Sequence, residues 1–352
     1  MSLKIANNLE LPVGLFNKRL AILAMQGAGK TYAAGVIEEE MMDYIIENPG
    51  INAKLIIIDA VGAHWGLREK YPIHIIGGDR GDIEIDVDSG HKFAELSHKL
   101  NLSMILDLSK LSQEEATNFV TDFSEKIFEL TKTPTHIIFE EADMFAPQRA
   151  VFSKQKFSLA AIDSIVRRGR GRGLGCTMIT QRPAVLNKNV LTQVDASILL
   201  NISGETDLKT IREYLDSAGI GKKEISGYIE KIIKFGKGEA LLFSPSWLKT
   251  IKEIKIRERI SFHSGAEPEL GKQNSADFVK LVQLDIQPLV NTLNGREISP
   301  ILKSAIPREN EYSIISETKI ISKKDKELGL GTKLLGVAFF AFITWLTIFL
   351  FS

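Results

Sequence analysis

The sequence has very little cysteine and no excess of either charge. Cys176 is the single cysteine among 352 residues, which excludes a disulfide framework and any zinc site built from several cysteines. The 44 basic and 44 acidic side chains cancel, which excludes a globally basic protein of the kind that coats nucleic acid. A locally basic segment remains compatible with this balance.

Long hydrophobic runs are also absent until the end of the chain, where residues 334–351 carry no charge. Eighteen helical residues span roughly 27 Å at about 1.5 Å each, close to the thickness of a bilayer core. We expect a single-pass transmembrane helix here; a buried helix or a contact with a partner is the alternative. Lysines precede the run, so the positive-inside rule places the rest of the chain in the cytoplasm. These lysines are Lys319, Lys323, Lys324, Lys326 and Lys333.

Most of the chain alternates apolar runs with helical patterns, which predicts an α/β fold with a mostly parallel sheet covered on both faces. The runs expected to form strands are 20–25, 54–59, 74–78, 103–108, 136–142, 176–181, 196–202, 239–245 and 251–260. Helices are expected at 31–46, 112–131 and 207–219. Three parts follow: a globular domain over 1–261, a tether over 262–333 with an amphipathic helix at 277–293 and a lysine-rich stretch, and the apolar end.

A phosphate-binding loop follows the first predicted strand of this alternation. Its residues are Gln26, Gly27, Ala28, Gly29, Lys30 and Thr31, the second half of the P-loop pattern. Glycines let backbone N–H groups close around phosphate oxygens, and the helix that follows favours the anion. Lys30 is expected to reach the β- and γ-phosphates of ATP, and Thr31 to bind Mg²⁺. The pattern's first glycine is replaced by Ala24, which would be strained if φ were positive there.

An acidic pair ends the predicted strand at 136–142. We expect Glu140 to hold Mg²⁺ and Glu141 to orient or deprotonate the attacking water. Aspartate is commoner at the first place, and glutamate is longer by one methylene. Gln181, at the end of another predicted strand, fits a residue that contacts the γ-phosphate and the water.

A basic segment precedes Gln181. Its candidates for an arginine finger or a DNA contact are Arg167, Arg168, Arg170 and Arg172. A solvated basic helix end is the alternative for each of them. Arg257 and Arg259 are weaker finger candidates.

The order GAGKT, FEEAD with FAPQR, and RRGRGRGLG followed by TQRPAVLNK resembles the HerA/FtsK superfamily of DNA-pumping ATPases, most of all its HerA-like branch. The resemblance covers about residues 8–268. It implies a RecA-like core, ATP hydrolysis between the subunits of a ring, expected to be a hexamer, and double-stranded DNA as partner. Lys30, Thr31, Glu140, Glu141 and Gln181 match the functional positions of that family.

Two other functions stay open at this point. The apolar end favours a membrane-anchored assembly or secretion factor that acts on protein. Ala24 and Glu140 instead suit a nucleotide-binding switch that does not hydrolyse ATP.

Overall fold

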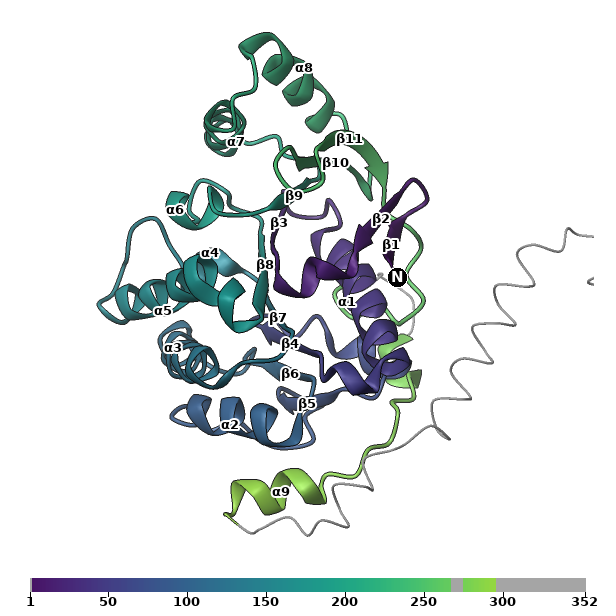
Figure 1. The fold of residues 1–352 in the computed structure, drawn as a ribbon, viewed down its shortest axis with the longest axis vertical. Coiled ribbons are helices and arrows are strands. Elements are labelled where there is room, and N and C mark those ends of the chain that lie inside the picture. Colours follow the sequence, from purple (N-terminus) through teal and green to yellow (C-terminus); the bar gives the residue numbers. More distant parts are fainter. Residues whose placement is uncertain (1, 267–274, 296–352) are drawn as a thin grey trace, which may run out of the picture. The chain divides into compact units, whose positions relative to one another are not determined.

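A computed structural model describes residues 2–266 and 275–295 (Figure 1). Its largest element is a nine-stranded sheet in the order β11-β10-β9-β3-β8-β7-β4-β6-β5. The strands from β9 to β5 are parallel, whereas β10 is antiparallel to β9 and β11. The predicted α/β fold with a mostly parallel sheet is therefore confirmed. The strands are β3 (Arg19–Leu23), β4 (Lys54–Asp59), β5 (His74–Gly77), β6 (Met104–Asp107), β7 (Thr135–Phe139), β8 (Leu174–Thr180), β9 (Ala196–Leu199), β10 (Glu239–Ser244) and β11 (Thr250–Lys255).

Helices lie on both faces of the sheet: α2, α3 and α5 on one, α1 on the other (Figure 1). The α-helices are α1 (Lys30–Glu47), α2 (Gly90–Leu100), α3 (Gln113–Leu130), α4 (Ala142–Phe145), α5 (Lys154–Arg168), α6 (Lys188–Leu191), α7 (Glu205–Ser217), α8 (Lys222–Ile232) and α9 (Gln287–Leu293). An N-terminal hairpin, β1 (Ser2–Ala6) with β2 (Leu9–Pro12), packs against α1.

The central strands are buried on both faces, and this explains their composition. Every residue of β4 is buried, as is every residue of β7 and β8. Parallel strands covered on two sides need continuous apolar runs rather than alternation. The runs predicted as strands therefore coincide with observed strands to within a few residues. The hairpin β1–β2 was not predicted, because its strands alternate buried and exposed residues instead of forming a continuous apolar run.

Strand order brings three functional segments to one edge of the sheet. β8 lies between β3 and β7, and all three strands are parallel. Their carboxyl ends are therefore neighbours, and ligands of open α/β sheets bind at this edge. The phosphate loop follows β3, the acidic pair follows β7, and Gln181 follows β8.

The predicted helix over 277–293 is shorter than expected. It begins as α9 at Gln287, and Pro288 lies in its first turn, where proline's missing N–H is tolerated. Residues before it lie on the domain: the Val282 N–H donates to the Arg68 carbonyl at 3.0 Å. Leu289 of α9 is buried.

The predicted transmembrane helix at 334–351 and the lysine-rich stretch lie outside the described residues. Within the part of the chain that the structure describes, no helix is long and apolar enough to cross a membrane.

Candidate active site

The phosphate loop joins β3 to α1 at the carboxyl edge of the sheet. Gly27 and Gly29 have φ of +76° and +98°, a region that strains any residue with a Cβ. Two backbone hydrogen bonds fix the start of the loop: the Ala24 N–H donates to the Thr180 carbonyl at 3.3 Å, and the Met25 N–H to the Asn201 carbonyl at 2.8 Å. The loop is thus tied to the ends of the strands on both sides of β3.

Ala24 causes no backbone strain. Positive φ among the described non-glycine residues occurs at Asn52, Asn101, Glu141 and Lys249. Ala24 has an ordinary φ, and its methyl group is buried in the core. The missing glycine therefore leaves the loop intact.

Lys30 lies between the two carboxylates that end β7. Its Nζ is 3.1 Å from Oε1 of Glu140 and 3.1 Å from Oε1 of Glu141. The hydroxyl of Thr31 donates to Oε1 of Glu140 at 3.5 Å. The structure thus brings together four of the predicted site residues: Lys30, Thr31, Glu140 and Glu141.

Burial and charge separate the two carboxyl groups. Burial alone would raise the pKa of Glu140, but His64 and Lys30 outweigh it and hold the pKa below its ordinary value of 4.5. Glu141 differs, because burial, helped by Glu140 and Asp143, raises its pKa against the opposing effect of Lys30. Burial opposes the charge of Lys30 as well, yet the two carboxylates raise its pKa. Of the pair, Glu141 has the pKa better suited to accepting a proton near neutral pH.

Gln181 follows β8 directly and is half-buried. Just before it, the Thr180 hydroxyl donates to Oδ1 of Asp143 at 2.5 Å, which joins the ends of β8 and α4. Gln181 therefore leaves the sheet at the same edge as Glu141.

His64 is a part of the site that sequence reasoning missed. The imidazole is fully buried; Nδ1 lies 2.7 Å from Oε1 of Glu38 on α1, and Nε2 lies 3.0 Å from Oε2 of Glu140. Burial would lower the pKa of His64, but Glu38, Asp59 and Glu140 raise it well above 6.5. The run of glutamates at 38–40 could have indicated a buried ionic contact of this kind. A helix that follows a phosphate loop packs on the sheet and therefore buries part of such a run.

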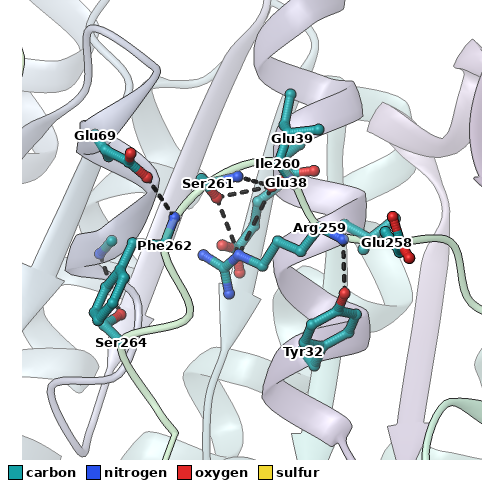
Figure 2. A network of polar contacts seen from close by, with 12 residues as sticks. Tyr32, Glu38, Glu39, Glu69, Glu258, Arg259, Ile260, Ser261, Phe262 and Ser264 are labelled. Carbon is teal, nitrogen blue, oxygen red and sulfur yellow. Dashed lines mark hydrogen bonds and ion pairs between the residues drawn. The ribbon is translucent and has the colours of Figure 1, made fainter. Parts of the chain in front are cut away.

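The segment 257–264, which we call the strap, runs from β11 back across α1 (Figure 2). Glu39 of α1 accepts hydrogen bonds from the N–H of Ile260 at 2.9 Å and from the N–H of Ser261 at 2.7 Å. The Tyr32 hydroxyl accepts from the Arg259 N–H at 2.7 Å. The strap is thereby fixed to the helix that begins at the phosphate loop.

The strap also holds the two weaker arginine-finger candidates inside the chain. Arg257 forms ion pairs with Glu39 at 2.8 Å and with Glu40 at 2.9 Å. The Arg259 side chain is 1% exposed. Both guanidinium groups thus lie against α1 within the chain, and a finger role at these positions stays a prediction that these contacts do not favour.

The four other arginines lie at the opposite edge of the sheet. They end α5 and form the 3₁₀ turn Gly169–Arg172, directly before β8. The length of β8 separates them from the phosphate loop by roughly 20 Å at about 3.3 Å per residue. They cannot contact phosphates bound by their own chain. All four are exposed: Arg167, Arg168, Arg170 and Arg172.

These exposed arginines are only loosely held. Arg167 donates to Asp163 at 2.8 Å, one helical turn away. Arg168 and Arg172 both lie over the ring of Phe128, at 5.2 and 4.6 Å from its centre. Such contacts leave the outer face of each guanidinium open to an anion.

The side-chain oxygens at this edge suit Mg²⁺ that is bound together with a nucleotide. Within residues 2–266 and 275–295 no group of three or more His, Cys, Asp or Glu side chains could hold a metal by itself. Mg²⁺ does not need one, because it binds through one or two protein oxygens together with phosphates and water. Thr31 Oγ1 and Glu140 Oε1, 3.5 Å apart, are oxygens of that kind.

Residues 7–139 match the family described as the central domain of helicase HerA. Over this segment the chain is similar to the HerA-like P-loop ATPases. The match ends at Phe139, so it includes the phosphate loop and His64 but stops before the acidic pair and the arginines.

Two curated relatives carry the name DNA double-strand break repair helicase HerA. The one from Pyrococcus furiosus is 29% identical over 136 residues, 39% of this chain and 23% of its own length. The one from Saccharolobus solfataricus is 26% identical over 186 residues, 45% of this chain and 36% of its own length. The HerA-like chain thus aligns with well under half of either relative.

A solved structure with a similar fold is the genome packaging NTPase of Sulfolobus turreted icosahedral virus 2, in complex with sulfate. The two are 16% identical with a TM-score of 0.46, over 69% of this chain and 98% of that one.

Proposed function

We propose that this HerA-like chain hydrolyses ATP with Mg²⁺ at the carboxyl edge of its sheet. The observation that carries the proposal is the meeting of Lys30 with Glu140 and Glu141 at the mouth of a glycine loop. A lysine at the start of a helix beside two carboxylates combines what phosphoryl transfer needs: a cation for the phosphates and a carboxylate for water.

Each residue has a distinct part in the proposed reaction. The N–H groups of residues 26–31 cradle the phosphates, and Lys30 exchanges its carboxylate contacts for β- and γ-phosphate oxygens. Glu141 accepts a proton from the attacking water, a role that its raised pKa favours. Gln181, on the neighbouring strand end, orients the water and the γ-phosphate. Thr31 and Glu140 would hold Mg²⁺, which when bound would neutralise charge on the phosphates.

Lys30→Ala tests the site assignment. Without the ammonium group the γ-phosphate loses its cation, so turnover should fall to background while the melting temperature stays within a few degrees. Lys110→Ala is the matched control, because Lys110 is an exposed lysine paired with Asp79 outside the site. Turnover by the Lys30 variant at the rate of the control contradicts the assignment.

We further propose that the chain forms a ring, expected to be hexameric, which moves double-stranded DNA. Support comes from the exposed arginines at the amino edge of the sheet and from the relatives named DNA double-strand break repair helicase HerA. Guanidinium groups bind phosphates of the DNA backbone without reading sequence. The alternative part for these arginines is to reach ATP bound by the next subunit. Molar mass in solution, measured with ATP, tests the ring; a monomer at every concentration contradicts it.

The uncharged stretch 334–351 supports a membrane tether for this motor and keeps a second function open, in which an anchored ATPase assembles or secretes protein. Removing the arginine charges distinguishes the two. DNA binding and its salt dependence fall only if the arginines hold DNA. A nucleotide switch is the third possibility, and hydrolysis well above that of a Glu141→Gln variant excludes it.

A further inference from the structure

We propose that His64, held by Glu38, is a positioning residue that fixes the carboxylate of Glu140 for its role beside the nucleotide. The inference rests on the proposed ATP site and adds to it a device within this chain. Its core is a buried chain of contacts from Glu38 through the imidazole to Glu140.

The two oxygens of Glu140 have separate partners. Oε1 faces the phosphate loop, 3.1 Å from Lys30 Nζ and 3.5 Å from Thr31 Oγ1. Oε2 points away from the loop to His64 Nε2 at 3.0 Å. Glutamate has one more rotatable bond than aspartate, so its carboxylate needs an additional contact to stay in one orientation. His64 supplies that contact on the oxygen that the nucleotide site does not use.

His64 is itself held from three sides. Nδ1 of His64 lies 2.7 Å from Oε1 of Glu38, and the backbone N–H of His64 donates to Oδ2 of Asp59 at 2.9 Å. Ser264 of the strap closes the same loop: its hydroxyl donates to the Ala63 carbonyl at 2.7 Å and accepts from the Gly66 N–H at 3.1 Å. The imidazole therefore has little freedom to rotate, as a group that orients another must.

Both ring nitrogens are engaged. Each lies within hydrogen-bond distance of a carboxylate oxygen, so the imidazole links Glu38 to Glu140. Carboxylates that bind a metal are held in place by hydrogen bonds from neighbouring residues, and losing such a partner typically costs about 10- to 100-fold in metal affinity or activity. A purely structural ion network predicts lower stability without a specific effect on Mg²⁺.

Two amide substitutions in the full-length chain distinguish a positioning role of His64 from a purely structural one. In His64→Gln the amide nitrogen takes the place of Nε2 and keeps a donor to Glu140. In His64→Asn it takes the place of Nδ1 and keeps only the contact with Glu38. The measurement is the affinity for a fluorescent ATP analogue across a Mg²⁺ titration. His64→Asn should raise the Mg²⁺ concentration for half-maximal effect about 10-fold or more, and His64→Gln less than about 3-fold.

His136→Gln is the matched control. His136 is also buried and bound through Nε2, to the Thr177 hydroxyl at 2.7 Å, but it begins β7 rather than ending it. His136→Gln should leave the Mg²⁺ titration unchanged, even where it lowers the melting temperature. Equal shifts for Asn and Gln at position 64, or a shift as large in the control, overturn the inference.

Two further results distinguish failure of the positioning role from failure of the proposed ATP site. If His64→Asn does not fold, Glu38→Gln replaces it: a shift of at least about 3-fold supports the positioning role, and an unchanged titration overturns it. If the unmodified protein binds the analogue with no dependence on Mg²⁺, the proposed ATP site itself fails. A normal Mg²⁺ titration that no change at position 64 affects removes only the positioning role.

Discussion

The two edges of the central sheet carry charge in opposite ways. At the carboxyl edge, Lys30, His64 and two glutamates are buried or nearly so, and each contacts another within about the length of a hydrogen bond. At the amino edge the arginines of residues 167–172 are exposed and mostly contact their own helix turn or one aromatic ring. A buried charged group needs partners inside the chain. An exposed charged group is solvated and can exchange its bound water for a ligand. This contrast suits the proposed roles, with chemistry at the carboxyl edge and a partner at the amino edge.

Replacing the base of the carboxyl edge should give the largest effect. Glu141→Gln keeps the size of the side chain but cannot accept the proton of water, so turnover should fall about 10²- to 10⁴-fold. Nucleotide affinity should stay within a few-fold, since Lys30 and the loop remain. Steady-state hydrolysis and a fluorescent-nucleotide titration measure the two. Parallel losses in both would show that Glu141 supports binding rather than chemistry.

Neutralising the amino edge should act on DNA alone. Glutamine at all four arginine positions should weaken duplex DNA binding on the order of 100-fold at moderate salt and lower the slope of log affinity against log salt by about 3 to 4. ATP hydrolysis without DNA should not change. Lys222→Gln with Lys223→Gln on α8 removes exposed charge elsewhere and is the control. An unchanged salt slope in the arginine variant would assign these residues to another partner.

One ion pair at the amino edge is structural, which sharpens the contrast with its exposed arginines. The Asp195 carboxylate accepts from Nε of Arg19 at 2.8 Å and from Nη2 of Arg19 at 3.0 Å. These contacts outweigh burial and lower the pKa of Asp195. A lowered pKa stabilises the fold above the unfolded value of about 3.8, and this contribution is lost as pH falls through the folded value. Asp195→Asn should cost about 2 kcal/mol at pH 7. Urea unfolding at pH 7, 5 and 3 should show the deficit shrinking only at the lowest pH; a constant deficit contradicts the ion-pair account.

The smallest effect is expected at Ala24. Because this residue has an ordinary φ and a buried methyl group, Ala24→Gly should leave turnover within about 2-fold and cost about 0.5–1 kcal/mol of stability through backbone entropy. Hydrolysis rates and urea unfolding of the variant test this. A large gain in turnover would show that alanine impairs the phosphate loop.

Local pattern predicted much of this molecule. The buried strands of the parallel sheet appear as apolar runs, and the helix expected at 112–131 is observed as α3. Spacing and residue type also predicted which side chains lie at the carboxyl edge. The ends of β3 and β7, on either side of β8, bring Lys30 and Glu141 together there. The hairpin β1–β2 lacks such an apolar run, because its strands alternate buried and exposed residues.

What escaped prediction depends on contacts between distant segments. His64 gains its partners from α1 and from β7, 26 and 76 residues away in the chain. Arg257 and Arg259 resemble finger candidates in sequence but are bound to α1 by a strap that only the fold reveals. The arginines of 167–172 could be read as part of the nucleotide site until the direction of β8 placed them at the other edge.

The most direct test measures ATP hydrolysis by the full-length protein at low salt against increasing duplex DNA, with and without the four arginine charges. The account predicts basal turnover in both proteins and a several-fold rise with DNA only in the unmodified one. Equal stimulation of both would contradict the role given to the amino edge. Absence of turnover in both would contradict the role given to the carboxyl edge.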